Sequence, residues 1–165
     1  MLNQPAPEFT LQSSTGESVN LADFKDRTVV LYFYPKADTP GCTKEACGFR
    51  DAIASYEKLK VPVFGISPDP VADVKSFAEK FHLNFPLLAD EDHSVSEKYG
   101  VWVQKEMAGN KYMGVARTTF IIDKGKIVAD GTPAELLAKS PTKRFDDVFR
   151  SLTTPDAEIR VEGGQ

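Results

Sequence analysis

Two strand patterns separated by a helical pattern constrain the fold of this chain most strongly. Residues 28–34, Thr-Val-Val-Leu-Tyr-Phe-Tyr, form a continuous β-branched and aromatic run, which is typical of a central strand buried on both faces. Residues 61–66 form a second such run. Between the two runs, apolar residues recur every three or four positions, at Ala46, Phe49, Ile53 and Tyr56. A strand, a helix and a second strand in this order predict parallel pairing.

The remaining patterns extend this unit into a larger sheet. We predict an α/β fold with a mixed central sheet flanked by helices on both faces, and with an N-terminal β-hairpin. The further expected elements, in chain order, are a hairpin within residues 9–21, a helix at 71–82, a strand at 85–89, a short helix at 94–99 ended by Gly100, a hairpin at 117–129, and a helix from about 133 to 152 that Ser140-Pro141 interrupts.

Length and charge limit the organisation and the partners of the chain. A chain of 165 residues fits one domain, so we expect a domain at residues 1–153 followed by a loose polar tail at 154–165. The net charge of −4, without clustered Lys and Arg, argues against a nucleic-acid or anionic-membrane partner. The apolar runs are too short to cross a bilayer, and the first residues lack the pattern of a secretory signal. We therefore expect a cytoplasmic protein with a small or neutral substrate.

The two cysteines, Cys42 and Cys47, lie within one six-residue window. Such a pair is not the pattern of a secreted disulfide scaffold and, in a reducing compartment, is typically catalytic, redox-sensing or metal-binding. On an ideal helix Cys42 shares the apolar face, whereas Cys47 lies about 140° away on the outer side. Their Cα atoms would be roughly 8 to 9 Å apart, although a disulfide needs less than about 7 Å. A bond between them therefore requires local unwinding of the helix.

Cys42 also occupies a special position in the chain. The segment at residues 35–42 links a buried strand to a helix, which is where open α/β sheets place their sites. Thr39 is a good N-cap and Pro40 a favoured first helical residue, so Cys42 falls in the first turn. Backbone N–H groups then point toward its sulfur, and this end of a helix stabilises a thiolate.

These residues resemble a known family. Pro35, Thr39 and Cys42, spaced as Pro-x-x-x-Thr-x-x-Cys, are similar to the active-site motif of the peroxiredoxins. The run Cys-Thr-Lys-Glu-Ala-Cys resembles the peroxiredoxin Q, or bacterioferritin comigratory protein, subgroup. The resemblance continues through residues 85–90 and 113–123 and covers the chain to about residue 152.

The resemblance implies a thioredoxin-like fold and a thiol-dependent peroxidase that reduces hydrogen peroxide and organic hydroperoxides. It implies that Cys42 attacks the peroxide to form a sulfenic acid and that Cys47 resolves it as an intramolecular disulfide. It further implies that Arg117 completes the pocket, and that thioredoxin or a similar thiol reductant reduces the disulfide. No cofactor or metal is expected, and the expected assembly is a monomer or a weak homodimer.

The rate gain from ionising the thiol is too small to account for a peroxidase. A free thiol of pKa about 8.5 is roughly 3% ionised at pH 7, so full ionisation gains at most about thirtyfold in rate. The larger share must come from donors aimed at the peroxide oxygens, each worth about 3 to 4 kcal/mol in a preorganised site. Arg117 and the Thr39 hydroxyl are the candidate donors, and Pro35 is expected to shield the sulfur from water.

Several simpler interpretations stay open for individual residues. Cys47 can be incidental, and Arg117 would by default be a solvated residue at a sheet edge. Glu45 either orients Arg117 or is an exposed acid in the first helical turn. His82 and His93 are expected at the surface, and Trp102 and Phe120 in the core.

Two other functions also compete with the peroxidase hypothesis. One is a general disulfide oxidoreductase, although those enzymes usually use Cys-x-x-Cys. The other is a redox sensor or metal-carrying module without turnover.

Overall fold

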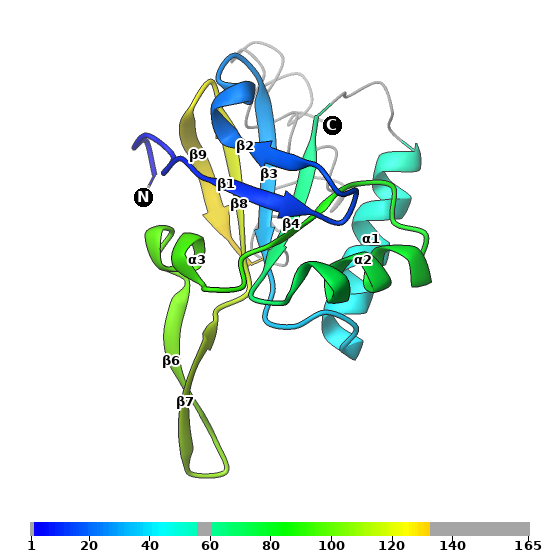
Figure 1. The fold of residues 1–165 in the computed structure, drawn as a ribbon. Helices are drawn as coiled ribbons and strands as arrows, with labels where there is room; N and C mark the ends of the chain where they lie inside the picture. Colours follow the sequence, from blue (N-terminus) through cyan, green and yellow to red (C-terminus); the bar gives the residue numbers. More distant parts are fainter. Residues whose placement is uncertain (1, 56–60, 133–165) are drawn as a thin grey trace, which may run out of the picture.

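The computed structural model describes residues 2–55 and 61–132 of the chain. Within these residues, seven strands form one mixed sheet in the order β2-β1-β5-β4-β3-β8-β9 (Figure 1). Its central and C-terminal strands are β3 (Thr28–Phe33), β4 (Val63–Ser67), β5 (Leu87–Ala89), β8 (Thr118–Asp123) and β9 (Lys126–Gly131). β3, β4 and β5 pair in parallel, whereas β8 and β9 continue the sheet in antiparallel pairs. The predicted mixed sheet is confirmed.

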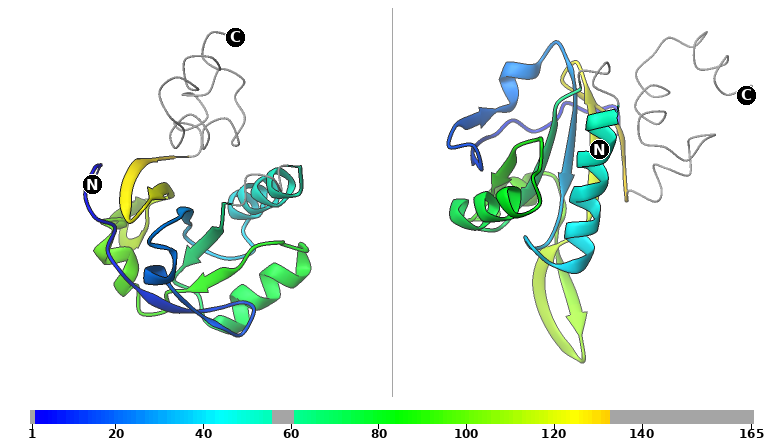
Figure 2. Two further views of the ribbon diagram at one scale, coloured as in Figure 1. Left: turned by 90° about the horizontal axis from the view of Figure 1, so that it is seen from above. Right: turned by 90° about the vertical axis from the view of Figure 1, so that its right-hand side faces the viewer.

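Helices cover both faces of this sheet (Figures 1 and 2). Side chains of α1 (Pro40–Ser55) and α2 (Val71–Lys80) share one apolar cluster with Tyr32, and α3 (Ser94–Lys98) contributes to a second cluster with Phe33. Because neighbouring residues of β3 point to opposite faces, the whole strand can be buried between these two layers. The expected strand buried on both faces is confirmed.

The N-terminal hairpin forms the far edge of the sheet. β1 (Thr10–Ser13) and β2 (Ser18–Asn20) pair antiparallel around Gly16, whose φ of 91° suits glycine. A short 3₁₀ turn, η1 (Leu21–Phe24), follows β2. β1 also pairs with β5, so the hairpin adds two strands to the sheet instead of standing apart.

A hairpin that was not expected from the sequence lies between α3 and β8. β6 (Trp102–Met107) and β7 (Asn110–Val115) form a separate two-stranded ribbon around Ala108 and Gly109, both of positive φ. The ribbon projects away from the sheet on the side where β3 ends (Figures 1 and 2). Most of its residues are exposed, so its sequence lacks the apolar alternation that marks a half-buried strand.

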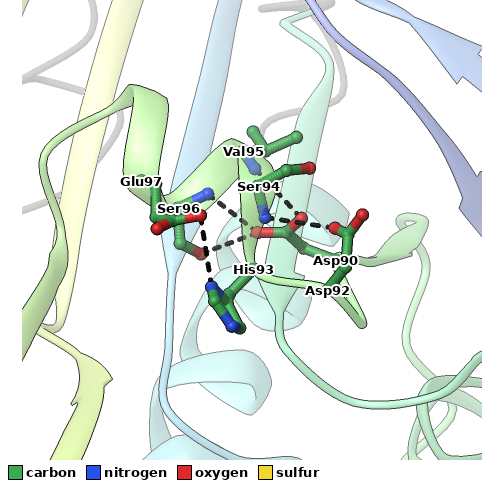
Figure 3. Close-up of polar contacts among 7 residues, drawn as sticks. All are labelled: Asp90, Asp92, His93, Ser94, Val95, Ser96 and Glu97. Carbon is green, nitrogen blue, oxygen red and sulfur yellow. Dashed lines mark hydrogen bonds and ion pairs between the residues drawn. The ribbon is translucent and has the colours of Figure 1, made fainter.

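The root of this ribbon lies against His93, just before α3, and the polar contacts around the start of α3 are drawn in Figure 3. Asp90 is fully buried, and its carboxylate accepts hydrogen bonds from Val95 N, Ser96 N and Ser96 Oγ at 3.1, 2.8 and 2.8 Å. The ring of His93 stacks on Trp102, with centroids 4.0 Å apart. Trp102, which was expected in the core, is partly buried and packs against the edge of a core cluster. Phe120 lies in the core as expected.

Three more of the expected elements are present in the structure. The helices predicted at 71–82 and 94–99 and the hairpin at 117–129 are confirmed, with Gly100 following α3 and Lys124-Gly125 forming the turn between β8 and β9. The helix expected from about 133 to 152 and the tail at 154–165 lie outside the described residues, so the domain boundary at 153 stays a prediction. None of the described helices has the length and apolar character that a bilayer crossing needs.

Candidate active site

The β3–α1 connection begins the site. β3 ends at Phe33 and α1 begins at Pro40, directly after Thr39, as the capping pattern predicted. The carbonyl of Thr39 accepts the first helical bond, from Thr43 N at 2.8 Å. This arrangement places Cys42 in the first turn of α1, where backbone N–H groups lack helical partners.

The two cysteines differ in their surroundings. Cys42 is 1% exposed and packs in the core cluster with Tyr32, Ala46 and Phe49. Cys47 lies on the same helix and is only half-buried, and both residues are free thiols. The prediction that Cys42 faces the core is confirmed, whereas Cys47, which was expected to face outward, is half-buried.

Arg117 brings a positive charge to the buried sulfur. It directly precedes β8, and its Nη2 donates a hydrogen bond to Cys42 Sγ at 3.0 Å. Its Nη1 donates to Glu45 Oε1 at 2.6 Å, so one guanidinium bridges two residues of α1. The side chain is 31% exposed, and the default interpretation as a solvated edge residue is wrong. Burial opposes the charge of Arg117, but the bonds to Cys42 and Glu45 outweigh it and raise its pKa.

Glu45 is buried behind this guanidinium. Its side chain is 7% exposed, so the alternative of an exposed helical acid is wrong. Burial raises its pKa above the ordinary value, and the charge and hydrogen bond of Arg117 act in the opposite direction. Its second oxygen, Oε2, has no hydrogen-bond partner among the described residues, which makes desolvation of the carboxylate costly. The structure thus places Glu45 where it fixes the orientation of Arg117.

The loop before α1 is held by a residue that sequence reasoning missed. Asp69 follows β4 and is buried, and its Oδ2 accepts hydrogen bonds from Ala37 N and Ser67 Oγ, both at 2.8 Å. Asp38 in the same loop pairs with Lys80 of α2 at 2.8 Å. The sequence did offer a signal for Asp69, because it follows the C-terminal end of a strand that pairs in parallel with β3. Residues at that edge of the sheet lie close to the β3–α1 loop.

Two further expected site residues, Thr39 and Pro35, belong to the β3–α1 connection. Within the described residues, the Thr39 hydroxyl donates to Lys36 O at 3.1 Å, and Pro35 is half-buried in the loop after β3. A Cβ added at Gly41 would lie 3.4 Å from Arg117 Nη2, so glycine leaves space beside the guanidinium. Residues 2–55 and 61–132 hold no group of three or more His, Cys, Asp or Glu side chains arranged for a metal ion.

These contacts define what the site can do chemically. A sulfur in the first turn of a helix, within hydrogen-bond distance of a guanidinium that is itself held by Glu45, is positioned to act as a nucleophile. A small electrophile is the fitting reactant, since the sulfur is almost completely covered by its neighbours.

Comparisons with known proteins identify the family of this chain. The AhpC/TSA family model matches residues 2–130. A putative peroxiredoxin bcp of Coxiella burnetii is 49% identical over 146 residues, covering 84% of this chain and 97% of that protein. Peroxiredoxin Bcp of Escherichia coli is 47% identical over 143 residues, covering 87% and 88% of the two chains.

Solved structures give the same result for the fold. Peroxidoxin BcpB of Mycobacterium tuberculosis superposes with a TM-score of 0.69 at 38% identity, covering 79% of this chain and 84% of that one. The bacterioferritin comigratory protein of Xanthomonas campestris superposes with a TM-score of 0.70 at 31% identity, covering 74% and 79%. The expected thioredoxin-like fold is confirmed.

Proposed function

The chain belongs to the AhpC/TSA family, in its Bcp or peroxiredoxin Q subgroup, and from this premise we propose that Cys42 and Cys47 carry out its reaction. The protein is a thiol peroxidase that reduces hydroperoxides. The observation that supports the residue roles best is the hydrogen bond from Arg117 to Cys42 Sγ at the start of α1. No other described group combines a buried sulfur with a cationic donor.

In the first step, the Cys42 thiolate attacks the terminal oxygen of the hydroperoxide. A sulfur–oxygen bond forms and the oxygen–oxygen bond breaks, so the sulfur loses two electrons and the peroxide gains them. The products are a sulfenic acid on Cys42 and an alkoxide or hydroxide that takes up a proton. Arg117 lies where it can donate to a peroxide oxygen as charge develops, and Glu45 keeps it in that position. We further propose that Thr39 acts as a second donor, once its hydroxyl turns from the Lys36 carbonyl toward the peroxide, and that Pro35 shields the sulfur from water.

In the second step, the Cys47 thiolate attacks the sulfenic sulfur and displaces its hydroxyl as hydroxide, which takes up a proton from solvent to give water and leaves an intramolecular disulfide. The two residues share α1, and five residues of ideal helix separate their Cα atoms by roughly 8 to 9 Å. The first turns of α1 must therefore unwind. Arg50 limits this unwinding, because its Nη1 donates to Phe81 O at 2.7 Å and its carbonyl accepts from Asn84 Nδ2 at 3.0 Å.

Thioredoxin, or a similar thiol reductant, completes the proposed cycle by reducing the disulfide. A disulfide between Cys42 and Cys47 would lie in an unwound segment, where another protein's thiolate can reach it. This cycle fits a reducing compartment such as the cytoplasm. The described fold buries its own core without a partner chain, so a monomer or a weak homodimer is the proposed assembly.

Peroxide turnover tests the proposal. Wild-type protein, Cys42→Ser and Cys47→Ser would each be mixed with thioredoxin, thioredoxin reductase, NADPH and hydrogen peroxide, and NADPH consumption would be followed. We expect turnover by the wild type, none by Cys42→Ser, and arrest of Cys47→Ser after one equivalent of peroxide. Full activity of Cys42→Ser would contradict the roles. Disulfide exchange without peroxide turnover in the wild type would favour a general disulfide oxidoreductase, and one oxidation without turnover would favour a redox sensor.

A further inference from the structure

The buried Cys42 has an exposed neighbour at the start of α1. On its inner side Cys42 packs in one apolar cluster with Tyr32, Ala46 and Phe49, and it is only 1% exposed. Gly41 directly precedes it in the helix and is exposed. Because the inner side is packed, a hydroperoxide reaches the sulfur from the start of α1, where Gly41 faces solvent.

Gly41 leaves a space beside Arg117. A Cβ built on Gly41 would lie 3.4 Å from Arg117 Nη2. Among the described residues, no other atom would lie within 4 Å of it, apart from its two chain neighbours and the adjoining backbone of α1. Because Cα–Cβ bonds in a helix tilt toward its N-terminus, this space lies at the open end of α1. Any side chain at position 41 would fill part of it.

One guanidinium nitrogen connects this space to the sulfur. Arg117 Nη2 donates to Cys42 Sγ at 3.0 Å and would also contact a side chain at position 41. A group in the space over Gly41 is therefore next to the nitrogen that would meet the attacked oxygen. The terminal oxygen of a hydroperoxide is small enough to reach a covered sulfur, whereas the organic group has to stay on the solvent side.

The backbone does not explain why residue 41 is glycine. Its φ lies outside the positive range that favours glycine, unlike the φ of Gly16 or Gly100. Within a helix, glycine is less favourable than alanine by about 1 kcal/mol. Local structure thus favours another residue at this position, and the space beside Arg117 is what glycine provides.

We propose that Gly41 determines the substrate range of Cys42, because the space left by its missing side chain takes the organic group of an alkyl hydroperoxide. This inference rests on the proposed function of Cys42. The sulfur bonds to the terminal oxygen, and the oxygen–oxygen bond breaks. The leaving oxygen keeps the electron pair and the organic group, and it takes up a proton from solvent to give an alcohol. Hydrogen peroxide carries no organic group and does not need the space.

Oxidation rates with peroxides of different size test this assignment. Reduced wild-type protein, Gly41→Ala, Gly41→Leu and the control Gly48→Ala would each be mixed with hydrogen peroxide, tert-butyl hydroperoxide and cumene hydroperoxide. Rapid quench with a thiol-alkylating reagent, followed by mass spectrometry, would give the rate of Cys42 oxidation. Gly48 is a matched control because it is the other glycine of α1, is exposed, and has nothing within 4 Å of a Cβ built on it.

The decisive quantity is the rate with each organic hydroperoxide divided by the rate with hydrogen peroxide. In an enclosed pocket one carbon atom changes such a ratio by about tenfold or more, so at the exposed Gly41 we expect a loss of at least about threefold for Gly41→Ala. Gly41→Leu fills more of the space and should lower the ratio by at least about tenfold, most for cumene hydroperoxide. Gly48→Ala should keep the wild-type ratio.

The smaller variant guards against a purely structural effect. A methyl group at position 41 fits beside Arg117 at ordinary contact distance, so Gly41→Ala decides the case even if Gly41→Leu displaces the guanidinium and slows all three peroxides. A Gly41→Ala protein that keeps the wild-type ratio, or that loses rate equally with all three peroxides, would overturn the assignment.

The wild-type rates separate this proposal from the proposed function. If the wild type fails to consume any of the three peroxides, the proposed function fails. If it consumes all three and the Gly41 variants keep its ratios, only the role of Gly41 fails. A wild type that consumes hydrogen peroxide but neither organic hydroperoxide would also overturn the role of Gly41 alone.

Discussion

Arg117 Nη2 lies 3.0 Å from Cys42 Sγ, although the two residues are 75 positions apart in the chain. The contact joins the start of α1 to the residue that enters β8, and β8 pairs with β3 along its whole length. The β3–β8 pairing therefore brings the loop between β3 and α1 close to Arg117, which directly precedes β8. Any loosening of the β3–β8 pairing would move the guanidinium away from the sulfur.

The first prediction concerns the fork geometry of Arg117. Arg117→Lys keeps the positive charge but cannot bond Cys42 and Glu45 through two fixed nitrogens. We expect oxidation of Cys42 by hydrogen peroxide to slow by about a hundredfold, the cost of one lost donor in a preorganised site. Stopped-flow fluorescence of Trp102 measures this rate.

Arg50→Lys serves as the control for this experiment. The Arg50 side chain bonds the Phe81 carbonyl and Asp51, not the site, so the first oxidation should stay within about threefold of the wild type. A similar rate for Arg117→Lys and Arg50→Lys would show that the fork is not needed.

The second prediction concerns pH and Glu45. Because burial raises its pKa above the ordinary 4.5, the folded protein holds a proton on Glu45 more tightly than the unfolded chain does. This stabilisation is complete below the ordinary pKa and is lost as pH rises through the raised pKa. Glu45→Gln removes this dependence. The stability of the wild type relative to Glu45→Gln should therefore fall from pH 4 to pH 7, by about 1.4 kcal/mol for each tenfold difference in proton affinity.

Urea unfolding at several pH values measures this difference. Glu79→Gln, which changes an exposed carboxyl on α2, should show a difference from wild type that barely varies with pH. A Glu45→Gln curve parallel to the wild-type curve would contradict the account of a desolvated carboxylate.

Sequence reasoning reached the parts of the fold that depend on local pattern. The run at 28–34 and the three- to four-residue period of α1 are visible because burial on a strand or a helix face repeats regularly. The β6–β7 ribbon has no such repeat, since most of its residues, Glu106 and Lys111 among them, are exposed on both faces. In the sequence, Gly65 is an ordinary residue of a strand pattern. In the structure, a Cβ at this position would lie only 2.7 Å from Tyr32 Cζ, so the packing requires glycine.

Some site residues could be predicted from local sequence, and others could not. Thr39, Pro40 and Cys42 could be placed at a helix start from capping chemistry alone. The contact of Arg117 with Cys42 depends on sheet pairing between distant segments, so spacing could not reveal it, and only the family resemblance pointed to it. Asp69 was missed because its partner is a backbone N–H in another loop.

The third prediction concerns unwinding of α1 during resolution. Gly48 follows Cys47 in the helix, and a Cβ there would meet nothing within 4 Å. Gly48→Ala should stabilise α1 by about 1 kcal/mol, which makes the unwound state about fivefold rarer. Disulfide formation should slow by that factor, while the first oxidation should not change. Rapid quench followed by mass spectrometry measures both steps.

A pair of variants at exposed Lys44 provides the matched control, because both remove the same charge. Lys44→Gly should form the disulfide faster than Lys44→Ala, since glycine weakens the helix by about 1 kcal/mol. Amide exchange should show less protection of residues 42–48 in the disulfide form than in the reduced form. Equal protection in both forms would contradict the unwinding.

The fourth prediction concerns the loop that leads into α1. Asp69→Ala leaves Ala37 N and Ser67 Oγ without their shared acceptor, which should lower the free energy of unfolding by about 2 to 4 kcal/mol. Asp38→Asn removes only an exposed ion pair with Lys80 and should cost less than about 1 kcal/mol. Urea denaturation compares the two, and an equal cost would mean that Asp69 does not hold the loop.

The most direct test of the account identifies the sulfur that reacts first. Reduced Cys47→Ser protein would receive one equivalent of hydrogen peroxide in the presence of dimedone, which captures sulfenic acids. Peptide mass spectrometry would then locate the adduct. The account predicts one adduct per chain, on Cys42, and none on Cys42→Ser protein treated in the same way. An unmodified Cys42 in the Cys47→Ser protein, or an adduct on Cys47 in the Cys42→Ser protein at a comparable rate, would contradict it.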